Sequence, residues 1–331
     1  MPIPASLKKR WHTLGNTRQI LAATQNLTIS PFDRTEDGLL DFRGIQLIGD
    51  ERSQEEIAKL PPIAQFPAGL LIPHRGVLRD ADFSGSQWSD VSVAHQNDGE
   101  TMRFDNVRFN GSTFKAKNAA NFGGLGAHLV ACDFDGCAFP KNIAFTRATL
   151  QNCRFTRIKK SSRLTFLHSL LENCTFEGDI HKADFDATPM KNCTFSGSLK
   201  DCFFRGEFSL AKQDAQTPLE NADFSQAELL VCTIANYDFS TAKPSPSNCI
   251  VRQTQPFYEA LADLIRQQKT AHADRLLEEA EDCRPHPQTP YGVFHADQLA
   301  PLSPKHYDAE TSRLFYGCVC QAAEATGCRV K

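Results

Sequence analysis

Cysteines are the residues whose number first suggests chemistry in this chain of 331 residues, which contains 12 of them. A series of seven comprises Cys132, Cys137, Cys153, Cys174, Cys193, Cys202 and Cys232. Thiolates bind zinc, but structural zinc sites need Cys or His pairs that converge from separate turns, commonly as C-x₂₋₄-C. The spacing of this series instead follows a repeat that runs through the whole middle of the chain. We therefore predict that these cysteines pack a core and bind no metal.

A looser group, Cys318, Cys320 and Cys328 with His306, lies near the end of the chain. Cys318 and Cys320 point about 200° apart if their segment is helical, so they do not converge on one ion. The sequence therefore predicts no metal site and no cofactor.

Catalytic motifs are absent from the sequence: it contains no G-x-S-x-G, no H-E-x-x-H and no P-loop. GGLGAH at 123–128 is glycine-rich but lacks the third glycine of a dinucleotide fingerprint, and we interpret it as a loop. Aspartate recurs as part of the repeat, which singles out no carboxylate pair. We predict that the chain is not an enzyme.

A small residue stands two positions before a large apolar one throughout the middle of the chain. Cysteine fills the small place before Phe155 and Phe176, and alanine fills it before Phe83 and Phe185. Residues two apart in an extended segment point to the same face, so each short segment directs one large and one small residue inward. Cysteine behaves as a small buried hydrophobe and replaces alanine in such places.

The large residues recur about every 20 residues, in units of five. One predicted column is Phe83, Phe104, Leu125, Phe145, Phe166, Phe185, Phe204 and Phe224. A second predicted column is Val93, Phe114, Phe134, Phe155, Phe176 and Phe195. Repeats of this length indicate a solenoid, in which each coil packs against its neighbours.

ADFSG at 81–85, ADFDA at 183–187 and CTFEG at 174–178 resemble the unit of the pentapeptide-repeat family, small-(Asp/Asn)-(Leu/Phe)-x-x. The resemblance covers about residues 80–243. It implies an all-β solenoid, a right-handed quadrilateral β-helix of about 20 residues per coil, flanked by α-helical segments. With coils about 4.8 Å apart, eight coils make a rod of about 40 Å.

The flanks divide the chain into three predicted parts. Residues 1–79 form a mixed N-terminal segment in which LLDFRGIQL (39–47) is either an early coil or a stray strand, and 48–79 is a short helix and a linker. Residues 80–243 form the β-helix. Residues 244–331 form an α-helical cap, with two helices in 256–283, an irregular stretch at 286–304 and a helix at 305–326.

Charge and hydropathy restrict the partners and the compartment. The net charge of −3 gives no general reason to expect nucleic acid or an anionic membrane as a partner. The chain has no apolar run long enough for a transmembrane helix, and its start does not resemble a signal peptide. We therefore expect a bacterial cytoplasmic protein with free thiols.

The first hypothesis for function is a protein-binding module, in one concrete form an immunity protein that neutralises a toxin, because pentapeptide repeats occur among such proteins. A basic run supplies the candidate binding residues Arg154, Arg157, Lys159, Lys160 and Arg163. Charge runs of this kind also occur as plain solvated corners, so this alternative stays open.

Two alternatives follow from the resemblance. Some pentapeptide-repeat proteins mimic DNA and bind gyrase or another topoisomerase, which requires a strongly acidic surface, whereas residues 80–243 contain 20 Asp and Glu against 17 Lys and Arg. Some effector ubiquitin ligases carry such a β-helix before a catalytic lobe with a cysteine, but the segment after residue 243 is short for such a lobe.

Overall fold

The computed structural model describes residues 4–49, 70–74, 76–95, 102–115, 120–121, 126–140, 143–160, 162–207, 216–302 and 307–331. The chain forms two compact units, residues 1–175 and 176–331, and each is described by itself. Most of the predicted helix and linker at 48–79 lies outside the described residues. So do residues 123–125 of GGLGAH, which include Leu125, and His306.

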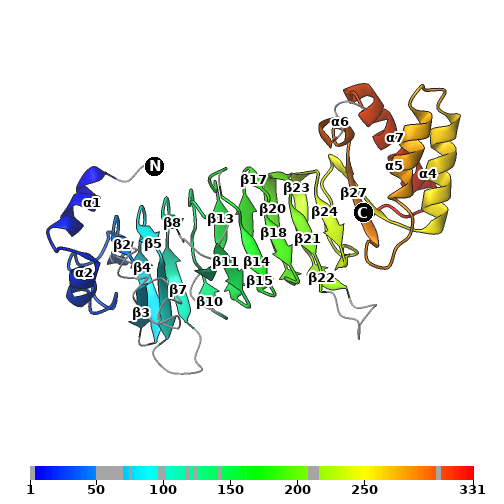
Figure 1. Ribbon diagram of the computed structural model, residues 1–331. Helices are drawn as coiled ribbons and strands as arrows, with labels where there is room; N and C mark the ends of the chain where they lie inside the picture. Colours follow the sequence, from blue (N-terminus) through cyan, green and yellow to red (C-terminus); the bar gives the residue numbers. More distant parts are fainter. Residues whose placement is uncertain are drawn as a thin grey trace, which may run out of the picture. The chain divides into compact units, whose positions relative to one another are not determined.

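The first unit consists mainly of short strands that pair in parallel from coil to coil (Figure 1). One ladder joins β1, β4, β7, β10, β12 and β15, a second joins β2, β5 and β8, and shorter ones join β3 to β6 and β9 to β11 and β14. The bounds are β1 Leu40–Asp41, β2 Gln46–Ile48, β3 Leu70–His74, β4 Val77–Asp82, β5 Gln87–Ser89, β6 Val91–His95, β7 Arg103–Arg108, β8 Thr113–Lys115, β9 Ala120–Asn121, β10 His128–Val130, β11 Ile143–Thr146, β12 Thr149–Gln151, β13 Arg154–Thr156, β14 Thr165–Leu167 and β15 Leu170–Glu172. The predicted β-helix is confirmed by these ladders, and the segment at 39–47 lies in them, because Leu40 and Asp41 pair with Ala81 and Asp82.

Stacked aromatic rings fill the interior of this unit. Phe42, Phe83, Phe109, Phe134 and Phe155 form one continuous column, with successive ring centroids 4.8, 5.7, 5.1 and 4.8 Å apart. The uniform period of about 20 residues is therefore wrong for the first coils, where successive members of the column are more than 20 residues apart. Phe83 and Phe104 consequently belong to different columns, since Phe104 pairs with Leu78.

Phe145 and Phe166 stack as predicted, with ring centroids 5.1 Å apart, but Phe104 is wrongly placed in their column, because it pairs with Leu129 in another ladder. Coils of even length begin in this part of the unit. The periodicity is therefore a reliable guide to register only where no residues are inserted between coils.

Six of the seven cysteines of the series are confirmed as buried packing residues, and Cys232 is half-buried. Cys132, Cys137, Cys153 and Cys174 are at most 1% exposed. The thiol of Cys153 donates to the carbonyl of Leu129 in the preceding coil at 3.4 Å, and burial raises its pKa well above the ordinary thiol value. A buried neutral thiol of this kind is an inert core group.

The coils turn at residues with left-handed backbone conformation, each directly before a small inward residue. Asn152 and Asn173 have φ of 56° and 52° and precede Cys153 and Cys174. Asparagine adopts this conformation more readily than most residues, because its side chain bonds locally to the backbone. The Asn-x-Thr triplet at Asn173 is thus explained by the turn.

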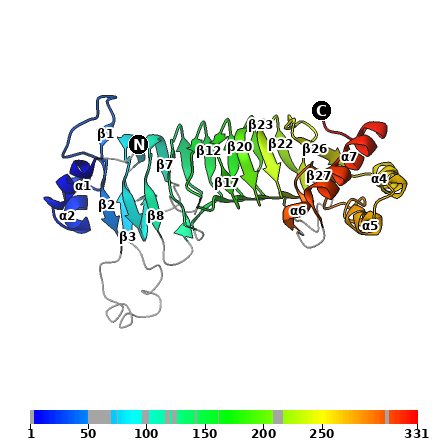
Figure 2. The ribbon, with the colours of Figure 1, turned by 90° about the horizontal axis from the view of Figure 1, so that it is seen from above.

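Two helices, α1 (Ala5–His12) and α2 (Thr17–Ala23), lie against the N-terminal coil (Figure 2). Trp11 is 1% exposed, and its indole N–H donates to the carbonyl of Arg43 at 2.9 Å. The carboxylate of Asp41 receives paired hydrogen bonds from both Arg10 and Arg43. These contacts fix α1 on the first coil.

The second unit continues the coil pattern, with 19 residues from Phe176 to Phe195 and 29 from Phe195 to Phe224. Its strands are β16 Thr175–Glu177, β17 Ile180–His181, β18 Asp184–Asp186, β19 Met190–Lys191, β20 Thr194–Lys200, β21 Phe203–Arg205, β22 Thr217–Glu220, β23 Asp223–Leu230, β24 Thr233–Ala235 and β25 Tyr237–Asp238. Phe176, Phe195 and Phe224 stack with ring centroids 4.9 and 4.6 Å apart. Phe185 and Phe204 stack at 5.0 Å as predicted, but the prediction that Phe224 continues their column is wrong, because Phe204 pairs with Ile234.

The last part of this unit combines helices with a two-stranded antiparallel sheet (Figure 1). The elements are β26 Asn248–Arg252, α4 Gln255–Gln267, α5 Ala273–Glu281, β27 Tyr291–His295, α6 Leu299–Leu302 and α7 Ala309–Ala325. The predicted helix pair and the last helix are confirmed. The prediction of an irregular stretch at 286–304 is wrong at β27, where Tyr291, Val293 and His295 alternate inward in a strand pattern.

None of the described helices combines the length and the apolarity that crossing a bilayer requires.

Candidate functional site: a basic groove over glycine corners

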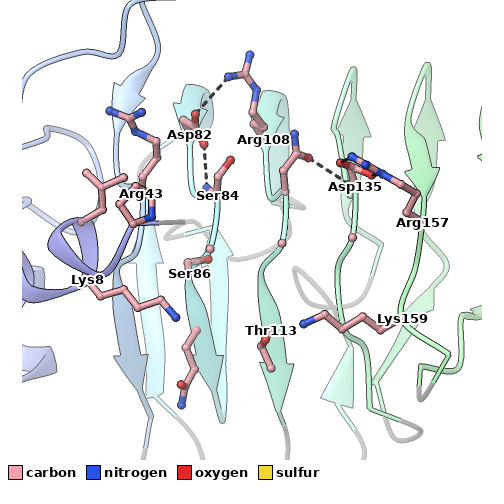
Figure 3. A pocket seen from close by; sticks show the side chains of 17 residues that line it. Lys8, Arg43, Asp82, Ser84, Ser86, Arg108, Thr113, Asp135, Arg157 and Lys159 are labelled. Atoms are coloured by element: carbon pink, nitrogen blue, oxygen red, sulfur yellow. Dashed lines mark hydrogen bonds and ion pairs between the residues drawn. The ribbon is translucent and has the colours of Figure 1, made fainter. Parts of the chain in front are cut away.

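A hollow of about 860 Å³ lies on the surface of the first unit and is called the basic groove below (Figure 3). Five of its lining residues are cationic and two are anionic. They are Lys8, Arg43, Arg108, Arg157 and Lys159, with Asp82 and Asp135. The remaining lining residues are small, polar or helical: Pro4, Leu7, Ser84, Gly85, Ser86, Gln87, Asn110, Gly111, Thr113 and Gly136.

Corner glycines form the floor of the basic groove. Gly85, Gly111 and Gly136 all have φ between 64° and 68°, which favours glycine. Their amides donate along the coils, as from Gly111 to the carbonyl of Asp135 at 2.6 Å, so the floor has no spare backbone donor there. A Cβ on Gly111 would meet no atom within 4 Å, which shows that the space above it is open. The turn favours glycine, and the missing side chains leave the hollow.

Helix α1 closes one end of the basic groove. A Cβ on Gly44 would lie 2.9 Å from the carbonyl oxygen of Leu7, so the helix packs directly on this corner. Lys8 follows Leu7 and enters the lining from the same helix.

Arg157 closes the other end. It occupies the corner that glycine occupies in the three preceding coils, with a φ of 48°. Its guanidinium forms a paired ion contact with Asp135, with Nε 2.7 Å from one carboxylate oxygen. This contact lowers the pKa of Asp135, against the opposite effect of partial burial.

Three of the five cations already have carboxylate partners. Arg43 contacts Asp41 at 2.8 Å, Arg108 contacts Asp82 at 3.2 Å, and Arg157 contacts Asp135. These pairs lie side by side in neighbouring coils. The arginines therefore contribute fixed shape and donors more than free charge.

The two lysines differ from the arginines. Figure 3 shows the side chains of Lys8 and Lys159 extending toward each other from opposite sides, across Ser86 and Thr113. Neither ammonium has a carboxylate within ion-pair distance among the residues that the structure describes. Excess positive charge in the basic groove thus comes from these two side chains.

The five residues of the predicted basic run are only partly brought together. Arg157 and Lys159 line the basic groove. Arg154 lies in β13 beside Asp133 of the preceding coil, Lys160 is exposed and Arg163 is half-buried, and none of these three is among the lining residues.

Sequence reasoning missed Lys8, Arg43 and Arg108. A signal for the floor was present, since Phe-x-Gly recurs at 42–44, 83–85, 109–111 and 134–136 and gives way to Phe-Thr-Arg at 155–157. No comparable signal brings Lys8 to this surface.

Among the described residues, no group of three or more His, Cys, Asp or Glu is placed to hold a metal ion. His306 of the looser cysteine group lies outside these residues.

Comparison with known proteins gave matches in solved structures alone. No protein-family model and no curated protein matches the chain. One similar structure is HetL, a pentapeptide repeat protein involved in heterocyst differentiation regulation from the cyanobacterium Nostoc sp. strain PCC 7120, at 12% identity over 69% of this chain and 83% of that one, with a TM-score of 0.30. Another is QnrB1, a plasmid-mediated fluoroquinolone resistance protein, at 15% identity over 62% of this chain and 89% of that one, with a TM-score of 0.21.

These TM-scores are too low to assign a fold, so the fold is assigned from the features of the chain itself. The five-residue unit, the parallel coil-to-coil ladders and the stacked phenylalanine columns are those of a β-helix built from five-residue repeats.

Proposed function

We propose that this chain is a non-enzymatic protein-binding module and that its basic groove holds an acidic segment of a partner protein. The observation that carries the proposal is the pair of lysines, Lys8 and Lys159, which extend toward each other from opposite ends of the row of corner glycines. Two ammonium groups without carboxylate partners favour a ligand that supplies carboxylates of its own.

The dimensions suit an extended segment. From the coil of Gly44 to that of Arg157 there are four coil steps, or about 20 Å at about 4.8 Å each. A strand-like segment rises about 3.3 Å per residue, so about six residues span this length. Because the corner glycines add no side chains, the backbone of such a segment can approach the floor closely.

The concrete form that we propose is an immunity protein in the bacterial cytoplasm, which neutralises a toxin by occupying an acidic surface on it. The alternative is a DNA mimic that binds gyrase or another topoisomerase. A protein surface that binds DNA is basic and would meet acidic side chains on a mimic. The basic groove has the opposite sign and so favours the first form.

The test is an affinity pull-down of the tagged chain from its own cells, with the double variant Lys8→Glu/Lys159→Glu. The matched control is Lys182→Glu/Lys191→Glu, which makes the same charge change on exposed residues of the second unit. We expect one stoichiometric partner that is retained by the control and lost by the groove variant. Equal capture by both variants would remove the basic groove from the proposal.

The identity of the captured protein separates the forms. A partner that is toxic when expressed alone, and harmless when expressed with this chain, supports the immunity form. Capture of gyrase, together with protection of gyrase in a supercoiling assay, would replace it with the second form. Formation of a ubiquitin thioester on the chain would contradict the non-enzymatic proposal altogether.

A further inference from the structure

A second cavity, of about 320 Å³, lies within the second unit and is called the cap cavity below. Strands β24 and β27, the end of α5, helix α6 and helix α7 contribute its walls (Figure 1). Its volume is at the lower end of the range for small-molecule sites, which run from about 300 to 1,000 Å³. The basic groove lies in the other unit, and the two sites share no residue.

Aromatic side chains form part of the walls of the cap cavity. Four rings line it, those of Tyr291, Phe294, Phe315 and Tyr316. The rings of Phe294 and Phe315 lie 6.4 Å apart at an angle of 58°. Gly292 makes room for one of them, since a Cβ there would lie 2.7 Å from the ring of Phe294 and 3.1 Å from the amide nitrogen of Gln253. The missing side chain at Gly292 thus shapes the cavity.

The charged groups of the cap cavity are acidic. Glu279 and Asp282 line it, and no lysine or arginine is among its lining residues in the described part of the chain. The lining imidazole of His295 lies 2.9 Å from the carboxylate of Glu228, so it faces a carboxylate of its own. Burial raises the pKa of the lining thiol of Cys283 to about 12, which keeps this group neutral.

An acceptor without a donor lies in the same lining. The side-chain oxygen of Gln253 is buried and has no hydrogen-bond partner among the residues that the structure describes, while its amide nitrogen donates to the carbonyl of Asp282 at 3.4 Å. A buried acceptor without a partner costs free energy, and a ligand with N–H donors would satisfy it.

We infer that the cap cavity binds a small organic cation, a primary ammonium group on a compact apolar body. Aromatic rings attract cations through the negative faces of their π-systems, carboxylates attract them directly, and the Gln253 oxygen accepts an N–H bond. A quaternary ammonium would satisfy the rings and the carboxylates but not the amide oxygen. The ammonium belongs either to a free amine or to a lysine side chain of another protein.

The experiment is calorimetric titration of the full chain with 2-phenylethylammonium and with neutral 2-phenylethanol, which matches it in size. We expect the cation to bind at least about tenfold more tightly than the alcohol, which corresponds to about 1.4 kcal/mol. Equal affinity, or no saturable binding of the cation, would overturn the inference. This comparison needs no variant and so does not depend on folding of a mutant.

A variant then locates the site. Glu279→Gln/Asp282→Asn should weaken binding of the cation by about tenfold and leave binding of the alcohol unchanged. The control Glu259→Gln/Glu310→Gln removes the same charge from exposed residues of α4 and α7 and should bind the cation as the unaltered chain does. An equal loss of affinity for the cation in both variants would show that long-range electrostatic attraction, and not the cap cavity, binds the cation.

The source of the ammonium is decided by a third titrant, Nα-acetyl-lysine methylamide. Binding tighter than that of 2-phenylethylammonium assigns the cation to a protein side chain, and weaker binding assigns it to a free amine.

Discussion

Replacing Arg157 tests whether the corner that ends the basic groove is a strained one. Arg157 has a φ of 48°, in the conformation that Gly85, Gly111 and Gly136 adopt at the same corner of the preceding coils. A non-glycine residue in this conformation costs about 1–2 kcal/mol. Arg157→Gly removes this cost, whereas Arg157→Ala retains it.

The two variants lose the same interactions of the Arg157 side chain. Both remove the ion pair with Asp135, which is worth roughly 0.2–1 kcal/mol because 70% of the Arg157 side chain is exposed. A glycine at this position lowers the stability by about 0.5–1 kcal/mol relative to alanine, because the unfolded chain is more flexible at glycine. The balance predicts that Arg157→Gly is more stable than Arg157→Ala by about 0.5–1 kcal/mol, and within about 1 kcal/mol of the unaltered chain.

Urea unfolding followed by tryptophan fluorescence measures this difference. Both tryptophans, Trp11 and Trp88, are buried in the first unit, so the signal reports on the unit that contains Arg157. Arg154 supplies the control, because it lies in β13 and has no left-handed conformation. There the order should reverse, with the glycine variant less stable than the alanine variant. If the glycine variant were the more stable one at both positions, or the less stable one at both, the explanation that Arg157 is strained by its left-handed conformation would be refuted.

Three further changes follow from the first unit. Phe134→Ala removes one ring from the stacked column and should lower the free energy of unfolding by about 3–5 kcal/mol, measured by the same unfolding assay. Asp41→Asn leaves Arg10 and Arg43 without their carboxylate and should cost about 2–3 kcal/mol at pH 7, less than a fully buried pair because Arg43 is about one-third exposed. Burial raises the pKa of Asp41, but the hydrogen bonds from the two arginines lower it overall. The stability that the Asp41 carboxylate contributes is therefore present above about pH 4 and is lost as the pH falls below that. The Asp41→Asn variant should not show this loss of stability when it is unfolded at a series of pH values. Cys153→Ala should cost no more than about 1 kcal/mol in the unfolding assay, and mass spectrometry of the native chain should find Cys153 unmodified by iodoacetamide.

The β-helix was predictable because its information is local. A small residue two positions before a large one identifies the inward face without any knowledge of the rest of the chain. Register was predictable only where coils have equal length, as between Phe145 and Phe166. Between Phe42 and Phe83, and again between Phe83 and Phe109, the longer separation breaks the count, and no local signal states how many residues are extra.

Other features depend on contacts that no repeat encodes. The prolines on either side of strand β27 favour an irregular stretch, although Tyr291, Val293 and His295 alternate inward as in a strand. Lys8 reaches the basic groove because Trp11 fixes α1 on the first coil, through the carbonyl of Arg43. This docking joins residues more than 30 positions apart and cannot be inferred from charge patterning.

The run of basic residues was a partial guide for a related reason. Side chains in a coil point in different directions, so neighbours in sequence need not share a surface. Arg157 and Lys159 lie beside the glycine corners, whereas Arg154 stands in a ladder of side chains next to Asp133.

Turn chemistry accounts for the place of the basic groove. A corner with positive φ favours glycine, and a row of such corners leaves a surface without side chains. The charge of the groove is then decided at its two ends, by Lys8 on α1 and by Lys159 next to the corner where arginine replaces glycine. The arginines between them are held by Asp41, Asp82 and Asp135, so they keep the walls in place and add little net charge. An acidic ligand would therefore be bound chiefly by the two lysines, which is why their reversal, and not that of the arginines, is the decisive change.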